Sequence, residues 1–249
     1  MILEKNFSNL KIILVEPNGP LNVGSVARLC SNFEVEELRI VSPKCDIFSL
    51  EARKMALKGQ EYLDNCKIFD NLENAIFDCD LVLASCGRID LSKDALIESS
   101  EDIFHWISSF KKINNLAFIF GREDRGLTND ELLLANKTFN IPTSLNNPSI
   151  NLSHAVSIVL YELNKSSRKN FNMELQFLNL ATSKQIHDSF VEIEEMLLEV
   201  GYLLKHTYSA KISKFKKYIL SANTSMHEIN VLRGIVHQIK WFVDNANRN

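Results

Sequence analysis

Residues that could carry chemistry gather in three polar loops of the sequence. The loops cover residues 16–28, 121–128 and 141–155, and each directly follows a run of residues typical of a β-strand. They bring together amide and hydroxyl groups, carboxylates and guanidinium groups, which can hold an anion or another polar ligand. The chemistry that these loops indicate is therefore ligand binding by backbone and side-chain donors.

The first loop, EPNGPLNVGSVAR, does not match the common phosphate-binding patterns. Gly19 and Gly24 have the spacing of the glycines in a P-loop, but Ser25 stands where the phosphate-binding lysine is required, and no G-x-G-x-x-G is present. The start of the following helix still offers free N–H groups to an anion, and Asn22 and Arg28 add polar reach. Arg28 could equally be an ordinary surface arginine with no role in binding.

The second and third loops each allow a binding and a structural interpretation. Gly121 and Gly126 bracket four charged residues and let the backbone approach a ligand closely, although a charged surface turn is the alternative. The third loop carries polar residues without acids ahead of an apolar helix. Ser149 or Asn151 could simply cap that helix, or the loop could line a ligand with hydrogen-bond donors.

Metal and nucleophilic chemistry are disfavoured by the sequence. The six histidines show no metal-ligand spacing, and His154, which is alone in an apolar helix, is expected to be structural. Cys86 follows a predicted strand but has no partner base near it in the sequence. The five cysteines are odd in number and form no C-x-x-C, so we expect neither disulfides nor structural zinc, and a cytoplasmic location.

Short strands alternate with helices along the first 165 residues, and this order predicts how the loops are positioned. Such alternation indicates an α/β fold with a mostly parallel sheet. Ligands bind at the carboxyl ends of such strands, where all three loops lie. We expect strands at residues 10–15, 37–41, 66–69, 81–85, 116–120 and 138–141, and helices at residues 24–33, 50–57, 71–77, 102–110, 128–135 and 151–163.

Charge and hydropathy divide the 249 residues into a domain at 1–165, a polar linker at 166–182 and an all-helical extension at 183–249. Residues 1–165 hold 17 basic and 23 acidic side chains, whereas residues 166–249 hold 11 basic and 8 acidic ones. The basic run KISKFKKY at 211–218 could follow a phosphate backbone, or it could be a solvated helix face. No run of 18 apolar residues predicts a membrane span, and the N-terminus lacks the pattern of a signal peptide.

Taken in order, the three loops are similar to the motifs of a known family. The segments LVEPNGPLNVGSVAR, FIFGREDRGLTNDEL and IPTSLNNPSINLSHAVSIVLYEL closely resemble the three motifs of the SPOUT class of S-adenosylmethionine-dependent RNA 2′-O-methyltransferases. The segments LLEVGYLL and HEINVLRGIVHQI resemble the C-terminal extension of the bacterial tRNA (cytidine-32/uridine-32) 2′-O-methyltransferases. The first loop departs from that subgroup outside its Asn-x-Gly-Ser-x-Ala-Arg core.

The resemblance implies an enzyme with a C-terminal trefoil knot that works as a homodimer, without a metal, on position 32 of the tRNA anticodon loop. Arg28 would be the catalytic arginine, and the polar positions around it would be Asn22, Glu123, Ser149 and Asn151. S-adenosylmethionine would be held mostly by backbone, at Ser85, Cys86, Gly87, Gly121, Ile141, Pro148, Ser149 and Ile150. The candidate RNA contacts are Arg88, Arg125, Lys211, Lys214, Lys216 and Lys217.

The expected role of Arg28 follows from the chemistry of guanidinium, which has a pKa above about 12 and stays charged. We expect Arg28 to stabilise the developing alkoxide and to grip the adjacent phosphate, with Glu123 orienting it. A general-base role for the arginine is the alternative. Two other functions also remain open, namely 2′-O-methylation of ribosomal RNA and RNA binding by a non-catalytic SPOUT module.

Overall fold

The protein divides into two compact units, Met1–Phe177 and Leu178–Asn249. The computed structural model describes residues 7–87, 97–108, 110, 113–144, 148–168, 181–203, 208–221 and 224–246. Within these residues, no helix is both long enough and apolar enough to cross a membrane.

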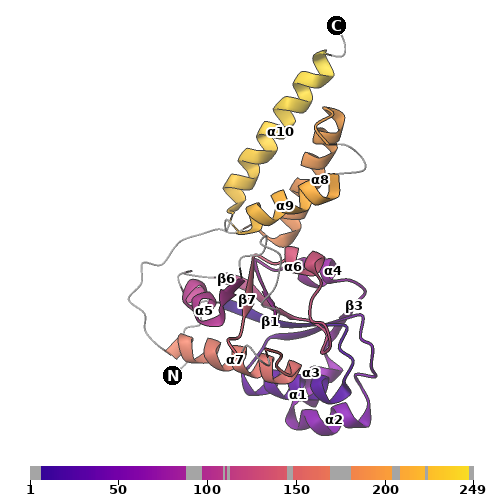
Figure 1. Ribbon diagram of the computed structural model, residues 1–249, viewed down its shortest axis with the longest axis vertical. Helices are drawn as coiled ribbons and strands as arrows, with labels where there is room; N and C mark the ends of the chain where they lie inside the picture. The colour runs from indigo at the N-terminus through magenta and orange to yellow at the C-terminus, as the bar shows by residue number, and fades with distance from the viewer. Residues whose placement is uncertain are drawn as a thin grey trace. The chain divides into compact units, whose positions relative to one another are not determined.

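A seven-stranded sheet forms the centre of the first unit (Figure 1). Its order is β3-β2-β1-β6-β4-β7-β5, and every neighbouring pair of strands is parallel. The predicted α/β fold with a parallel sheet is therefore confirmed. The strands are β1 (Phe7–Val15), β2 (Glu37–Val41), β3 (Lys67–Phe69), β4 (Leu81–Ser85), β5 (Ile97–Ser99), β6 (Ile113–Phe120) and β7 (Lys137–Asn140).

Helices cover both faces of this sheet (Figure 1). One face carries α1 (Pro20–Asn32), α2 (Leu50–Ala56), the 3-10 turn η1 (Leu57–Gly59), α3 (Gln60–Asp64) and α7 (Leu152–Arg168). The other face carries α4 (Leu72–Ile76) and α6 (Asn129–Leu133), while α5 (Ser100–Ser108) packs against α7. Because both faces are covered, consecutive residues of β1 such as Ile12, Ile13 and Leu14 are all fully buried.

Close backbone packing holds α1 in place. The helix begins at Pro20, a position in the first turn that proline favours. A Cβ atom on Gly24 would lie 2.2 Å from a backbone oxygen of α2, and one on Gly59 would lie 2.5 Å from a backbone oxygen of α1. Glycine is therefore required at both contacts. The packing fixes the rotation of α1, which buries Val26 and leaves Arg28 exposed.

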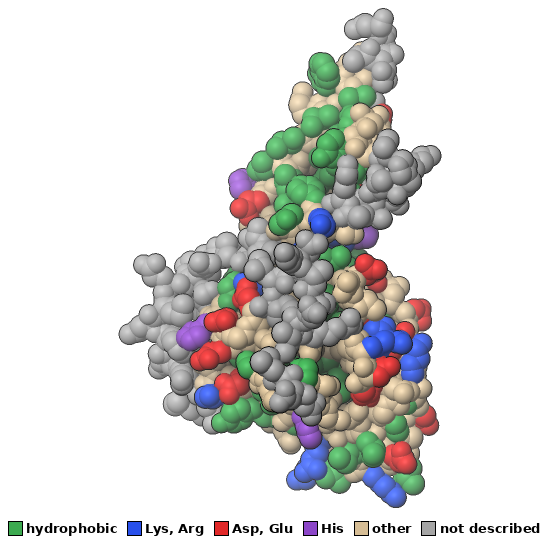
Figure 2. Space-filling model, viewed as in Figure 1, with side chains coloured by type: hydrophobic (Ala, Val, Ile, Leu, Met, Phe, Trp, Pro, Cys, Tyr) green, Lys and Arg blue, Asp and Glu red, His purple; other side chains and the backbone are tan. Residues whose placement is uncertain are grey.

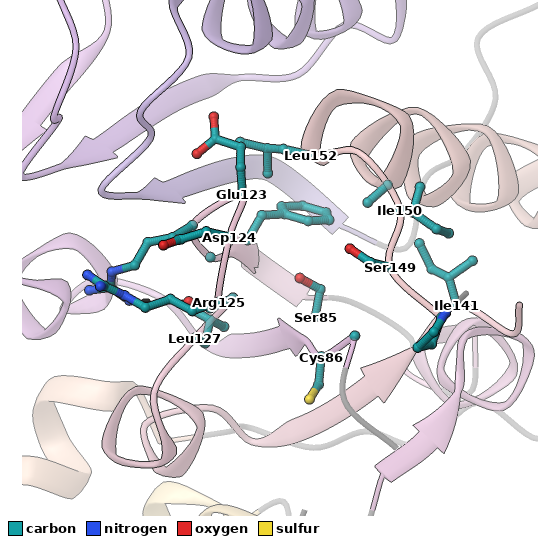
Figure 3. Close-up of a pocket in the computed structure, with 17 residues that line it drawn as sticks. Ser85, Cys86, Glu123, Asp124, Arg125, Leu127, Ile141, Ser149, Ile150 and Leu152 are labelled. Atoms are coloured by element: carbon teal, nitrogen blue, oxygen red, sulfur yellow. Dashed lines mark hydrogen bonds between the residues drawn. The ribbon is translucent and has the colours of Figure 1, made fainter. Parts of the chain in front are cut away.

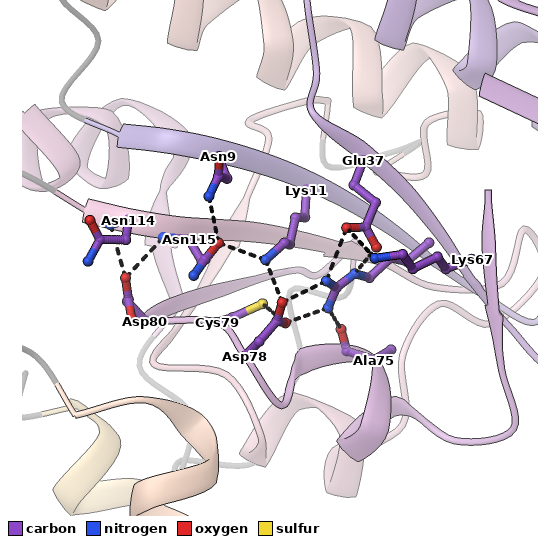
Figure 4. Close-up of polar contacts among 11 residues, drawn as sticks. Asn9, Lys11, Glu37, Lys67, Ala75, Asp78, Cys79, Asp80, Asn114 and Asn115 are labelled. Atoms are coloured by element: carbon purple, nitrogen blue, oxygen red, sulfur yellow. Dashed lines mark hydrogen bonds and ion pairs between the residues drawn. The ribbon is translucent and has the colours of Figure 1, made fainter. Parts of the chain in front are cut away.

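The amino-terminal edge of the sheet is closed by a buried ionic cluster (Figure 4). Lys11 and Arg39 are each only 3% exposed, and both donate to the carboxylate of Asp78, at 2.7–2.9 Å. Burial would raise the pKa of Asp78, but the hydrogen bonds from Arg39 and Lys11 outweigh it and hold that pKa well below its usual range. Removing Asp78 would leave two buried cations without this partner, so the cluster serves stability at the edge away from the three loops.

The boundaries differ from the prediction in a few places. Helix α1 begins four residues earlier than expected, and α3 and β5 were not predicted. Helix α7 continues to Arg168, three residues into the predicted linker at 166–182, of which residues 169–180 lie outside the described part of the chain. The trefoil knot stays a prediction, because residues 88–96 and 145–147 also lie outside the described part.

The second unit is helical, as predicted, with α8 (Ser183–Glu199), α9 (Tyr208–Ser221) and α10 (Met226–Ala246). Both predicted capping boxes are present, at Thr182 and at Ser225. Phe190 packs on Phe215 at a ring distance of 5.3 Å, and Phe215 stays partly exposed rather than turning fully inward. Apolar side chains, drawn green, are visible on the surface of this unit (Figure 2). Among the exposed ones on α10 are Val231, Ile235, Trp241 and Phe242.

Candidate functional site

A cavity of about 520 Å³ lies at the carboxyl ends of β4, β6 and β7 (Figure 3). We call it the loop cavity. Its walls come from residues 85–87 after β4, residues 120–127 at and after β6, and residues 141 and 148–155 around the loop that leads into α7. The volume is within the range of about 300–1,000 Å³ that is usual for small-molecule sites. Parallel strands end at one edge of the sheet, so segments far apart in the sequence meet here.

A tight turn after β6 forms one wall of the loop cavity. Arg122 and Gly126 bond to each other through their backbones, at 3.3 and 2.9 Å, and Gly126 has a φ of +68°. A Cβ atom on Gly121 would lie 2.2 Å from the backbone carbon of Gly126. Both glycines are therefore needed for the turn to close, and the closed turn forms this wall of the cavity.

All of the residues predicted to bind S-adenosylmethionine line the loop cavity. They are Ser85, Cys86, Gly87, Gly121, Ile141, Pro148, Ser149 and Ile150. The structure thus brings together segments that are 36 to 65 residues apart in sequence, counted from Ser85 to Gly121 and to Ile150. A mainly apolar wall that also carries polar groups suits the adenosine and methionine parts of that cofactor, so the residues present fit it. Their contacts with a cofactor remain predictions.

Hydrogen bonds join the three loops at one side of the loop cavity. Asn151 Nδ2 donates to Asn22 Oδ1 at 3.0 Å, and Asn22 Nδ2 donates to Glu123 Oε1 at 2.9 Å. The Glu123 carboxylate also accepts the backbone N–H groups of Asn18 and Gly19, each at 3.0 Å. We call this chain of bonds the three-loop network. It places three of the five predicted catalytic residues in mutual contact.

The electrostatics of the three-loop network keep Glu123 ionised. Partial burial would raise the pKa of Glu123, but the hydrogen bonds from Asn22, Asn18 and Gly19 together outweigh it and hold that pKa below its usual range. The carboxylate therefore acts as a fixed acceptor for donors of the first loop.

Asn151 has two roles in the structure. Its Oδ1 accepts the backbone N–H groups of Ser153 at 3.0 Å and His154 at 3.3 Å, which caps the start of α7. Its Nδ2 remains available for Asn22. The capping interpretation of this residue and the site interpretation are therefore compatible, because one amide serves both.

The expected contact between Glu123 and Arg28 is absent within one chain. Both oxygens of Glu123 are taken by the first loop, while Arg28 lies six residues beyond Asn22 on α1, about 9 Å along the helix axis. Arg28 is exposed, does not line the loop cavity, and makes no hydrogen bond or ion pair with the described residues. Arg28 therefore does not reach the cavity of its own chain.

An ionic cluster at the wall of the loop cavity was not predicted from the sequence. Arg122 donates through Nε to Glu16 at 2.6 Å and through both terminal nitrogens to Glu131 at 2.9 Å. The Arg122 side chain is only 9% exposed, so the interpretation of this segment as a charged surface turn is wrong for it. A signal was present, since Glu16 ends a strand and Glu131 belongs to a capping box.

The other predicted residues are spread more widely. Arg125 lines the loop cavity and lies 3.4 Å from Glu16, with a largely exposed side chain. Lys214 is exposed on α9, and Lys216 and Lys217 are partly buried there. Arg88 and the side chain of Lys211 lie outside the described residues. Cys86 is buried at the wall of the cavity. The described residues contain no cluster of three His, Cys, Asp or Glu side chains suited to a metal.

Comparison with solved structures defines the fold of the protein. The crystal structure of TrmJ from Z. mobilis superposes with a TM-score of 0.79 over 94% of this chain and 100% of that one, at 24% identity. The fold is that of the SPOUT methyltransferases, an α/β domain with a helical C-terminal extension.

The chain belongs to the SpoU rRNA methylase family, whose family model matches residues 9–161. An uncharacterized tRNA/rRNA methyltransferase from Haemophilus influenzae is 30% identical over 95% of this chain and 96% of its own length. The tRNA (cytidine-2′-O-)-methyltransferase TrmJ from Sulfolobus acidocaldarius is 42% identical over 62% of this chain. The alignment spans 64% of that archaeal protein, just under two thirds. Family membership supports the prediction of an S-adenosylmethionine-dependent methyltransferase.

Proposed function

We propose that this protein methylates a ribose 2′-hydroxyl of tRNA, at position 32 of the anticodon loop, in the cytoplasm. The observation that carries the proposal is the three-loop network, which joins the three motif segments at the loop cavity. Similarity to a protein named as a tRNA (cytidine-2′-O-)-methyltransferase supports the reaction and the substrate class. The position in tRNA rests on the resemblance of the C-terminal segments.

Some residues of this chain bind the cofactor in this proposal, and others align the ribose with it. S-adenosylmethionine supplies an electrophilic methyl group on a sulfonium. Residues 85–87 and 121–127, which line the loop cavity, would hold that cofactor. The three-loop network keeps Asn22 and Asn151 in one arrangement at the cavity rim, and Ser149 lies exposed beside them as a donor to the ribose. Holding both reactants in one geometry is a main source of rate acceleration for such a transfer.

Arg28 acts on the cavity of a partner subunit in this proposal. It is remote from the loop cavity of its own chain, and helix α1, which carries it, packs beside α7. Both helices expose apolar side chains on the surface, with Leu21 53% exposed and Tyr161 57% exposed. A homodimer formed across α1 and α7 would bury these side chains and bring Arg28 to the partner's cavity as a fixed cation.

Mixing two inactive variants tests whether the site is shared between subunits. Arg28→Ala removes the arginine, and Gly121→Val prevents closure of the turn that forms one wall of the loop cavity. If the site is shared, mixed dimers contain one intact site, and a 1:1 mixture regains about one quarter of wild-type activity. If each chain uses its own arginine, the mixture stays inactive. Arg28→Lys should retain reduced but measurable activity, because a cation remains without the forked geometry. Complete loss with intact cofactor and tRNA binding would contradict the electrostatic role.

The basic run on α9 is proposed to contact the tRNA backbone. Lys214 is exposed, and Lys217 lies nearly one turn further along the same helix. Lys214→Gln combined with Lys217→Gln should weaken tRNA binding and lower the salt slope of the affinity by about 0.7–0.9 per lost phosphate contact. An unchanged salt slope would show that these lysines of α9 do not contact tRNA.

Nucleoside mass spectrometry of RNA from cells without this protein tests the function directly. Loss of a 2′-O-methyl at tRNA position 32 is the expected result. Loss from ribosomal RNA would favour the second candidate, which the name of the matching family model suggests. Calorimetry with S-adenosylmethionine separates both enzymes from a non-catalytic RNA-binding module, which would not bind the cofactor.

A further inference from the structure

Arg122 connects three segments that meet beneath the loop cavity. Its Nε bonds to Glu16, at the end of β1, and its two terminal nitrogens form a forked pair with Glu131, in α6. Its backbone belongs to the turn that forms one cavity wall. Three charged hydrogen bonds in a side chain that is 9% exposed are largely shielded from solvent.

Each carboxylate that Arg122 holds also fixes backbone. Glu131 Oε2 accepts the backbone N–H of Thr128 at 2.7 Å, which completes the capping box of α6. Glu16 has a φ of 46°, a left-handed conformation that is costly for a residue other than glycine, and it directly precedes Pro17. The bond from Arg122 to Glu16 helps to hold this conformation, and with it the direction in which the first loop leaves the sheet.

Arg122 and Glu123 each form hydrogen bonds with the first loop, at different positions. Arg122 binds a carboxylate of the first loop at its start, and Glu123 binds the N–H groups of Asn18 and Gly19 and the amide of Asn22. Because the two residues are adjacent in the turn, a shift of Arg122 would move Glu123 and the cavity wall together. The two other cations near Glu16 are a poor substitute for Arg122, because Lys44 at 3.5 Å is 54% exposed and Arg125 at 3.4 Å is 62% exposed.

We infer that Arg122 is a positioning residue that sets the affinity of the loop cavity for S-adenosylmethionine, acting through Glu16 and Glu131. The inference rests on the proposed function, because it takes the cofactor to occupy this cavity. A guanidinium is required, since a lysine ammonium can satisfy one carboxylate but cannot bridge both with a fork.

The test measures cofactor affinity of the full chain by calorimetry for wild type, Arg122→Met, Arg122→Lys and the control Arg53→Met. Arg53 forms a comparable but more exposed ion pair with Asp64 in the α2–α3 region, at 2.8 Å. We expect Arg122→Met to raise the Kd for S-adenosylmethionine about tenfold or more, Arg122→Lys to recover part of this loss, and Arg53→Met to match wild type. The Kd for tRNA without cofactor should stay within about twofold in all variants, which a general loss of structure would not allow.

Three outcomes decide between the possibilities. A folded Arg122→Met with wild-type cofactor affinity overturns the inference. If Arg122→Met does not fold, Arg122→Lys and Glu16→Gln take its place, and wild-type affinity in both overturns it equally. If the wild-type protein itself does not bind S-adenosylmethionine, the proposed function fails instead.

Discussion

Replacing Glu123 by glutamine tests the three-loop network with little change of shape. Glu123 Oε2 accepts a single donor, Asn18 N, whereas Oε1 accepts both Gly19 N and Asn22 Nδ2. The glutamine amide nitrogen must take one of these positions. It will face Asn18, because that side is exposed and water can serve the displaced donor.

The size of the effect follows from this choice. One hydrogen bond to a charged group is lost, and two others become neutral and weaker. A hydrogen bond to a charged group contributes about 1.5–3 kcal/mol to the free energy of unfolding. Because the Asn18 side is exposed, we expect the substitution to lower this free energy by about 1.5 kcal/mol, which is roughly a factor of ten in the folding equilibrium. Methyl transfer should fall by at least the same factor, since the first loop is no longer held in one arrangement.

Urea unfolding and initial rates of methyl transfer measure the two effects side by side. Glu73→Gln is the control, because Glu73 is an exposed residue of α4 that makes no hydrogen bond or ion pair with the described residues, and it should change stability by under about 0.5 kcal/mol. The folded pKa of Glu123 is lowered, so its contribution is present above about pH 4.5 and is lost as the pH falls through the folded value. A Glu123→Gln variant as stable and as active as the control at pH 7 would refute the reasoning.

Three further outcomes follow from the structure. Gly121→Ala should weaken cofactor binding about tenfold in calorimetry, because its Cβ would lie 2.2 Å from backbone, whereas Gly234→Ala, with open space around it, should not. Gly24→Ala should lower stability by about 1–3 kcal/mol in urea unfolding, since its Cβ would meet the backbone of α2. The hydrogen bonds from Arg122 lower the pKa of Glu16 and, despite the effect of burial, the pKa of Glu131. Stability measured by acid titration should therefore fall below about pH 4.5. Unchanged stability down to about pH 3 would contradict this.

The convergence of the three loops could be predicted from the sequence, because parallel strands end at one edge of a sheet. That rule was enough to bring Ser85, Gly121 and Ile150 to one cavity. The order of the strands could not be predicted. β6 lies between β1 and β4, and only contacts between segments about a hundred residues apart decide this.

The partners of the charged side chains were the least predictable part of the site. Glu123 was expected to orient Arg28, but the packing of Gly24 and Gly59 turns Arg28 outward and leaves Glu123 to the first loop. Arg122 was indistinguishable in sequence from its exposed neighbour Arg125, because only the tertiary structure buries one of the two. Rotations of helices and burial of single side chains depend on distant packing and leave no local pattern.

The hydrogen bond between Asn22 and Asn151 spans 129 residues of chain. A ribosome that has just added the first asparagine must therefore complete the whole sheet before the second emerges. Until then the three-loop network cannot form, so a chain released early lacks the contacts that join the three loops.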